Sequence, residues 1–170
     1  MPPSEEELKQ AAETLAKLKP GFLPLPIFLQ TARLTVTSPV ELVVLRKGKS
    51  GTEVYLTGRD SGDPFWPGLL HVPGTVVLSS DELGEDLEGP ISRLVKDEFQ
   101  GVEITDKPQL LMTKFRQSER GRELAHIYWV EGNGGVEKNW YPSSKVKSLK
   151  IFQGHIELIE ETVKKLKEQS

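Results

Sequence analysis

The chain contains no cysteine. This absence excludes disulfide bonds, metal sites built from thiolates and catalysis by a thiol nucleophile. Long apolar runs are missing as well, since no stretch approaches the ~20 residues that a membrane-spanning helix needs. The N-terminus lacks a cationic segment followed by an apolar run, which is the pattern of a secretory signal. We therefore expect a cytoplasmic protein with no membrane partner.

A strong excess of either charge is also lacking. The formal net charge is −3 over 170 residues, so no overall field attracts nucleic acid or an anionic membrane. A chain of this length has the size of one domain. At that size it buries roughly 70% of the surface that its unfolded form exposes. We expect a globular protein with a core of its own.

The spacing of apolar and β-branched residues predicts a mixed α/β domain. The expected helices are residues 4–18, 90–99 and 155–169, and the expected strands are 31–38, 40–48, 52–59, 69–78, 107–115 and 123–132. Ser4 and Glu7 form a capping-box pattern at the first helix, whose apolar side we expect to pack. Residues 21–30 are rich in proline and predict an extended connector, and residues 116–122 predict a charged loop. We divide the chain into an N-terminal helix with its connector, 1–38, and a main domain, 39–170.

The stretch EDLEGPISRLVKDEF, residues 85–99, raises a specific question about function. An acidic loop leads into a helix that carries Asp97 and Glu98 three and four residues beyond Leu94, so these side chains share one side of a turn. Glu98 projects close to the apolar stripe of the helix, where an unpaired charge is costly to bury. It must reach water, pair with an arginine or bind a cation. The residues themselves allow both a metal-binding face and an ordinary solvated helix.

Together with VYLTGRDSGDPFWPGLLHVPGTVVLSS before it, this stretch resembles the Nudix family. The box of that family is written G-x5-E-x7-R-E-U-x-E-E-x-G-U, where U is a bulky aliphatic residue. Gly74 fits the first glycine, Glu85 and Arg93 have the E-x7-R spacing, and Asp97 and Glu98 fit the paired acids. The resemblance extends over residues 41–167. It implies a Nudix-like α/β/α sandwich around a mixed β-sheet, with an extra N-terminal helix.

Two features depart from the box. Ten residues separate Gly74 from Glu85 where the pattern has five, and Leu94 replaces the glutamate that follows the arginine. Leucine can neither bind a metal nor act as a base. Loss of a general base typically slows a reaction about 100- to 10,000-fold. The departures therefore indicate an enzyme that is slow, inactive or rebuilt with other residues.

The resemblance implies hydrolysis of a diphosphate linked to another group, such as a nucleoside, with Mg²⁺ or Mn²⁺ as cofactor. Divalent metals offset the phosphate charge and lower the pKa of a bound water. The metal is expected at Glu85, Asp97, Glu98 and Gly74. Glu98, Asp97 and Arg93 are the expected catalytic residues, with Arg93 orienting a carboxylate such as Glu85.

Substrate contacts are expected from the loop that follows residues 52–59. Arg59 could hold a phosphate or form a surface salt bridge, and Phe65 and Trp66 could stack on a planar group or pack in the core. The basic residues of 114–122 could attract phosphates. The three histidines are expected to be ordinary structural residues.

Two other functions remain open. Leu94 would also suit a catalytically inactive Nudix-fold module that binds a nucleotide or a protein. The Trp66-Pro67-Gly68 sequence also occurs in isoprenoid diphosphate isomerases of this fold, but that chemistry uses a cysteine, which this chain lacks. The expected partner is a small-molecule diphosphate or nucleotide, with no strong signal for nucleic acid, and the resemblance allows a homodimer.

Overall fold

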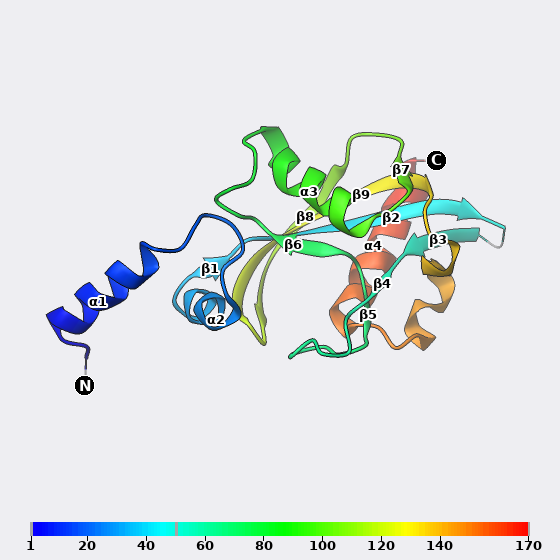
Figure 1. Ribbon diagram of the computed structural model, residues 1–170. Coiled ribbons are helices and arrows are strands. Elements are labelled where there is room, and N and C mark those ends of the chain that lie inside the picture. Colours follow the sequence, from blue (N-terminus) through cyan, green and yellow to red (C-terminus); the bar gives the residue numbers. More distant parts are fainter. Residues whose placement is uncertain (1, 50, 170) are drawn as a thin grey trace.

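A mixed β-sheet lies between helices on its two faces (Figure 1). The computed structural model describes residues 2–49 and 51–169. Within these residues, eight strands share one sheet in the order β1-β9-β2-β3-β10, with β6 beside β2 and with β7 and β8 beside β9. A separate two-stranded sheet joins β4 to β5. The expected α/β/α sandwich around a mixed sheet is confirmed.

The helices and strands follow one another in an irregular α/β order. The helices are α1 (Glu5–Leu15), α2 (Leu25–Leu34), α3 (Glu88–Glu98) and α4 (Gln153–Gln169), with short 3₁₀ turns η1 (Glu85–Leu87), η2 (Glu137–Asn139) and η3 (Ser143–Ser148). The strands are β1 (Val36–Thr37), β2 (Pro39–Gly48), β3 (Gly51–Tyr55), β4 (Thr57–Gly58), β5 (Leu70–His71), β6 (Gly74–Val76), β7 (Val102–Ile104), β8 (Gln109–Ser118), β9 (Gly121–Gly134) and β10 (Trp140–Pro142). The expected strand 69–78 is interrupted before Gly74, so that it forms the two short strands β5 and β6.

The strand β2 is the centre of both cores, because successive side chains of a strand point to opposite faces of the sheet. Val43 and Leu45 face α4 and pack with the core on that side. Leu42 and Val44 face α3 and pack with the core on the other side. β2 runs parallel to β9, with Leu42 opposite Tyr128. One polar residue, Glu41, interrupts this buried strand and is 5% exposed.

The expected extended connector at 21–30 is wrong, because most of it belongs to the helix α2. Pro24 is the N-cap residue of α2 and Pro26 lies in its first turn. Proline is tolerated there, since the first N–H groups of a helix have no intrahelical acceptor. The helix also takes up the beginning of the expected strand 31–38, which is reduced to the two residues of β1.

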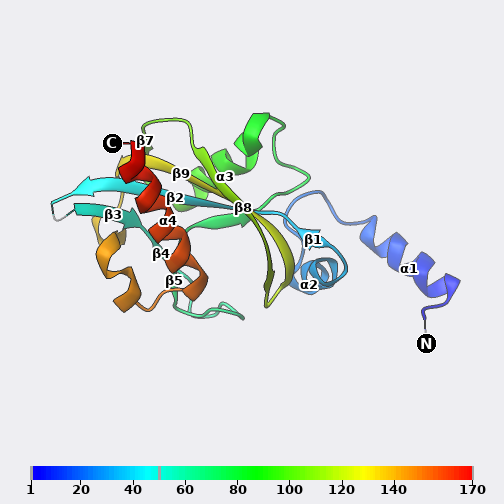
Figure 2. The same ribbon diagram turned by 180° about the vertical axis from the view of Figure 1, so that it is seen from behind.

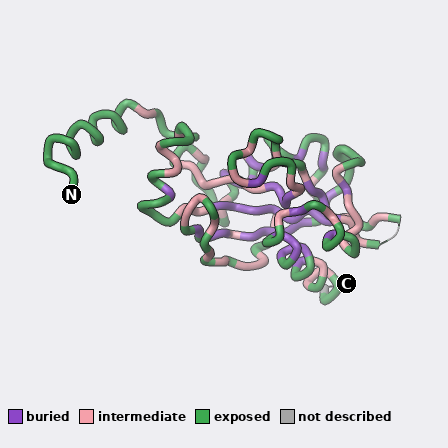
Figure 3. The backbone as a smooth tube through the Cα atoms, turned by 90° about the horizontal axis from the view of Figure 1, so that it is seen from below, coloured by how far each residue is buried: buried purple, intermediate pink, exposed green. Residues whose placement is uncertain are grey.

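The expected packing of the first helix is also wrong. α1 forms with the predicted capping box, but none of its residues is buried. It projects away from the sheet in Figures 1 and 2, and Figure 3 shows it exposed along its length. Leu8 and Leu15 keep 55% and 50% of their surface in solvent.

The expected charged loop at 116–122 is largely strand. β8 continues to Ser118 and β9 begins at Gly121, so a tight turn joins them. This brings the basic side chains of the segment onto the sheet, where they contact buried carboxylates. No helix in the described part of the chain combines the length and the apolar character needed to cross a membrane.

Candidate functional site

Arg93 is fixed at the base of the acidic loop by four hydrogen bonds. Its Nε and Nη2 donate to the two carboxylate oxygens of Asp81 at 2.6 and 3.0 Å. Its Nη1 donates to Thr75 Oγ1 at 2.7 Å and Nη2 also donates to the carbonyl of Val76 at 2.9 Å. Arg93 therefore orients a carboxylate as expected, but this carboxylate is Asp81 and not Glu85.

Leu94, which stands where the box pattern has a glutamate, lies in the core. Leu94 is 1% exposed and packs with Ile91 and Phe99 in the cluster on the α3 side of the sheet. Leu94 is therefore a core residue. A carboxylate on this helix position would point into an apolar environment.

The acidic residues of the loop before α3 point in different directions. Asp86 and Glu88 both bind Lys107, at 3.3 and 2.9 Å, and are largely exposed. Glu85 is exposed and forms no ion pair with any described residue. The chain cannot carry a side chain at Gly89 without movement, because a Cβ there would lie 2.0 Å from the carbonyl oxygen of Glu82. The lengthened loop thus packs its backbone tightly against the start of α3.

Asp97 and Glu98 lie at the C-terminal end of α3, and neither forms an ion pair with a described residue. Partial burial and the charge of Asp97 raise the pKa of the Glu98 carboxyl, whereas Arg59 acts in the opposite direction. Two neighbouring carboxylates without a cation repel each other. A divalent cation would remove this repulsion.

The fit of a metal to these residues is partial. The described residues include no group of three or more His, Cys, Asp or Glu side chains arranged to hold a metal ion, so Glu85, Asp97 and Glu98 do not form a closed site. Magnesium, however, is often held by one or two carboxylates together with water and substrate phosphates. Asp97 and Glu98 suit such an open site, and their role in it stays a prediction.

Gly74 lies in β6, directly opposite Glu41 of β2. A Cβ at Gly74 would come within 3.0 Å of both Glu41 Cγ and the carbonyl oxygen of Val40. A side chain at this position would therefore crowd the two strands where they approach closely. Its expected part in metal binding stays a prediction.

Arg59 is held in place by the loop that follows β4. Its Nη1 donates to Asp63 at 2.9 Å, and the same carboxylate accepts the backbone N–H groups of Phe65 and Trp66 at 2.9 and 2.8 Å. The guanidinium carbon lies 4.7 Å from the centre of the Trp66 ring. Only Nη1 of Arg59 finds an acceptor among the described residues, so most of its five N–H donors are free for a ligand.

Trp66 is buried, with 8% of its surface exposed. Besides Arg59, the guanidinium carbon of Arg120 lies 5.1 Å from its ring centre, and the rings of Phe65 and Phe152 lie 5.6 and 5.2 Å away. Trp66 thus supports the two arginines, and its ring is covered by the chain itself.

A cleft of about 290 Å³ opens beside Arg59 on the α4 side of the sheet. Charged side chains dominate its walls. The basic ones are Arg59, Lys114, Arg116 and Arg120, and the acidic ones are Glu41, Glu119 and Glu123. We call this space the cationic cleft. A smaller cavity beside it is also lined by Arg59 and Arg120 and reaches Gly74 and Thr75.

Two buried carboxylates form the floor of the cationic cleft. Arg116 binds Glu41 through Nη2 and Glu123 through Nε, the latter at 3.0 Å. Glu123 is 1% exposed and also accepts hydrogen bonds from Arg120 Nη2 at 2.8 Å and from Ser118 Oγ at 3.0 Å. Because each buried carboxylate is paired with an arginine, these ion pairs fix Arg116 and Arg120 in position.

His155 completes the pairing of Glu41. Its Nδ1 accepts the backbone N–H of Val72 at 2.9 Å, so the proton of the neutral ring lies on Nε2, which is 3.5 Å from Glu41 Oε1. Burial raises the pKa of Glu41, but His155 and Arg116 outweigh it and hold this pKa at about 2. Burial and nearby positive charge lower the pKa of His71 to about 4. Both histidines are structural, but His155 also lines the cleft.

Sequence reasoning missed Glu41 and His155. The signal for Glu41 was a single carboxylate within the apolar run VELVV, because a charge in a buried strand requires a partner. Arg116 and Arg120 were expected as basic residues that could attract phosphates, but their assignment to a loop hid their pairing with Glu41 and Glu123. No local pattern indicates His155, whose role depends on the docking of α4 onto the sheet.

Comparison with solved structures supports this fold. No family model matches the chain, and no curated protein matches its sequence. Among solved structures, the NUDIX domain of Shewanella oneidensis NrtR, crystallised with ADP-ribose, is 21% identical with a TM-score of 0.63, over 91% of this chain and 97% of that one. A mutT/nudix family protein from Listeria innocua is 14% identical with a TM-score of 0.57, over 79% and 97% of the two chains. The MutT protein of Methanosarcina mazei Go1 is 16% identical with a TM-score of 0.54, over 78% and 96%. The sandwich, the loop-helix segment with Arg93 and these likenesses together identify the fold of this chain as Nudix-like.

Proposed function

We propose that this protein binds a nucleoside diphosphate linked to a further group and hydrolyses the diphosphate with Mg²⁺ or Mn²⁺. The observation that carries the proposal is the position of Arg59. It lines the cationic cleft, and its charge also acts on the Glu98 carboxyl at the end of α3. Arg59 thus connects the donors of the cationic cleft electrostatically with the carboxylate at the end of α3.

Charge supports the binding of a diphosphate in the cleft. Its acidic residues Glu41 and Glu123 are neutralised by Arg116, while Arg59 keeps unused N–H donors. Arg120 adds a buried Nε that has no partner among the described residues. An anion with several oxygens would satisfy these donors, and hydrogen bonds to charged groups typically contribute about 1.5–3 kcal/mol each.

Asp97 and Glu98 would hold the metal, with the phosphate oxygens of the ligand as further metal ligands. When bound, the metal would offset the phosphate charge and activate a water. Arg93 acts as a positioning residue, because it ties the loop at Asp81 to the strand β6 and to α3. The ADP-ribose bound to the NUDIX domain of NrtR makes this compound a suitable first ligand.

A second candidate function is binding without hydrolysis. The burial of Leu94 favours it, because this helix position cannot supply a base. Under this alternative the cationic cleft still binds the diphosphate compound. Only the chemical step is missing.

Product analysis separates the two functions. ADP-ribose, a dinucleotide diphosphate and a nucleoside triphosphate would be incubated with the protein and either Mg²⁺ or Mn²⁺, and the products separated by anion exchange. We expect slow metal-dependent cleavage that Glu98→Gln abolishes and that the exposed control Glu103→Gln leaves unchanged. Binding of the same compounds with no cleavage in either metal would establish the second function.

The domain boundary and the homodimer, both expected from the sequence, remain proposals. The division of the chain at residue 38 can be tested by limited proteolysis. A homodimer is favoured by the exposed apolar residues Leu8 and Leu15 of α1. Sedimentation equilibrium of the whole chain and of Leu15→Glu would test whether α1 contributes to association.

A further inference from the structure

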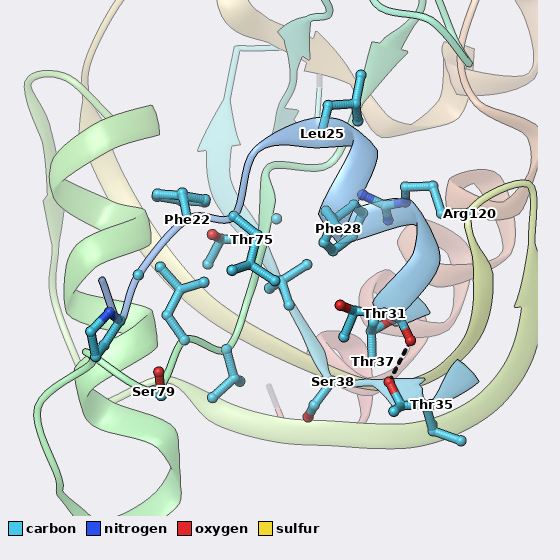
Figure 4. Close-up of a pocket in the computed structure, with 18 residues that line it drawn as sticks. Phe22, Leu25, Phe28, Thr31, Thr35, Thr37, Ser38, Thr75, Ser79 and Arg120 are labelled. Carbon is cyan, nitrogen blue, oxygen red and sulfur yellow. Dashed lines mark hydrogen bonds between the residues drawn. The ribbon is translucent and has the colours of Figure 1, made fainter. Parts of the chain in front are cut away.

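A second groove, of about 620 Å³, lies between the N-terminal segment and β6 (Figure 4). Its apolar walls include Phe22, Leu25 and Phe28 on one side and Val76 and Val77 on the other. This volume lies within the range of small-molecule sites, which are mostly apolar with a few placed polar groups. We call it the N-terminal groove.

Hydroxyl groups form the polar part of the N-terminal groove. They belong to Thr31 of α2, to its C-cap residue Thr35, and to Ser38 and Ser79. The two threonine hydroxyls donate to carbonyl groups of their own helix. The hydroxyls of Ser38 and Ser79 have no hydrogen-bond partner among the described residues. Apolar walls with free hydroxyls suit a flat heteroaromatic ring, whose faces are apolar and whose edge carries donors and acceptors.

The N-terminal groove borders the proposed diphosphate site. Arg120 lines both the groove and the cationic cleft, and Gly74 and Thr75 line both the groove and the small cavity beside Arg59. Figure 4 shows the guanidinium of Arg120 directed towards the ring of Phe28. The groove and the cleft are thus neighbours on either side of Arg120, and a ligand with two parts would place one part in each.

Trp66 is not available for the aromatic part of such a ligand, because its ring is covered by two guanidinium groups and two phenyl rings. The guanidinium carbon of Arg93 lies 5.1 Å from the centre of the Phe22 ring, but Phe22 is 69% exposed and so keeps surface for a ligand. We propose that the N-terminal groove binds the aromatic base of the ligand whose diphosphate lies in the cationic cleft. This inference rests on the proposed function. It means that the N-terminal segment makes the protein select diphosphates that carry a nucleoside over those that do not.

The test compares ADP with inorganic pyrophosphate by calorimetry, because only ADP carries a base. ADP is expected to bind more tightly to the wild-type protein. Phe28→Ala is expected to weaken ADP binding about 3- to 10-fold, the range for one aromatic pair, and to leave pyrophosphate binding unchanged. Leu34→Ala is the matched control on the same helix, since Leu34 is 70% exposed and does not line the groove.

A second variant and a direct measurement cover the case in which Phe28→Ala fails to fold. Phe22→Ala removes an exposed ring and is expected to weaken ADP binding in the same way. In the wild-type protein, nuclear Overhauser contacts are expected from the adenine protons to the rings of Phe22 or Phe28. Contacts to other aromatic rings, with ADP affinity unchanged in both variants, would overturn the inference while leaving the diphosphate site intact. Failure of pyrophosphate and ADP alike to bind would instead refute the proposed function.

Discussion

Arg93 and Asp81 form a two-point ion pair, in which Nε and Nη2 of the arginine reach the two carboxylate oxygens at 2.6 and 3.0 Å. Their side chains are 20% and 6% exposed. The pair connects α3 to a loop residue twelve positions earlier in the chain, and the hydrogen bond with Arg93 lowers the pKa of Asp81. Six residues separate Gly74 from Asp81, close to the five of the box pattern, so the extra residues of this chain lie between Asp81 and Arg93.

Loss of the Asp81 carboxylate should therefore destabilise the fold. Asp81→Asn would leave a partly buried guanidinium without its anion, and breaking one partner of a buried pair costs about 3 kcal/mol. Glu85→Gln, which removes the carboxylate first assigned to Arg93, should change the free energy of unfolding by less than about 0.5 kcal/mol. Urea unfolding at pH 7 measures both. Equal losses in the two variants would show that Glu85 shares the pairing.

Leu94→Glu should destabilise the protein and should not restore activity. The side chain is 1% exposed and lies among Ile91 and Phe99, so the new carboxylate would be buried without a partner. We expect a loss of about 3–5 kcal/mol or no folded protein at all. Leu94→Met, which keeps the volume, should cost less than about 1.5 kcal/mol. A folded Leu94→Glu variant with faster cleavage would show that the helix can turn this position towards the substrate.

Stability should fall in acid through Glu41. The folded state holds its pKa at about 2, below the ordinary 4.5, so its contribution is present above pH 4.5 and is lost as the pH falls towards 2. A shift of this size corresponds to about 3 kcal/mol at neutral pH. Glu41→Gln should lower the free energy of unfolding at pH 7, and the difference from the wild type should shrink at pH 3. If the two proteins differed in free energy of unfolding as much at pH 3 as at pH 7, Glu41 would stabilise the fold through packing alone. The exposed Glu13→Gln serves as control.

The effect of Glu98 on stability should depend on pH in the direction opposite to that of Glu41. Its pKa is raised in the folded state, so the folded protein is favoured when the carboxyl is protonated and loses this advantage as the pH rises through that pKa. Without divalent metal, Glu98→Gln should slightly raise Tm at pH 8 and leave it unchanged at pH 4. Addition of Mg²⁺ or Mn²⁺ should then stabilise the wild type only. Stabilisation of both proteins by metal would place the ion elsewhere.

The sequence predicted the fold well where local patterns decide the structure. The apolar stripe of α3 and the capping box of α1 are read from neighbouring residues, and both helices form as expected. The prolines of α2 were misleading because their effect depends on position within the first turn. The exposure of α1 could not be predicted, since an amphipathic helix does not reveal whether its own chain offers a surface to cover it.

The candidate site was less predictable because its pairings are long-range. Glu41 meets Arg116 and His155 from distant parts of the chain only when the sheet and α4 assemble. The choice between Asp81 and Glu85 as partner of Arg93 depends on the path of the loop. Spacing favoured Glu85, whereas the path of the backbone places Asp81 against the guanidinium.

The central claim is that a diphosphate held by Arg59 lies beside a metal held by Glu98. The most direct measurement is the relaxation of the phosphorus nuclei of bound ADP-ribose by Mn²⁺, which depends steeply on the distance between ligand and metal. We expect strong relaxation in the wild type and in the control Arg122→Gln, loss of the effect in Glu98→Gln, and about 10- to 100-fold weaker ligand binding in Arg59→Gln. Tight binding of ADP-ribose with no relaxation by Mn²⁺ in the wild type, or full relaxation in Glu98→Gln, would contradict the account.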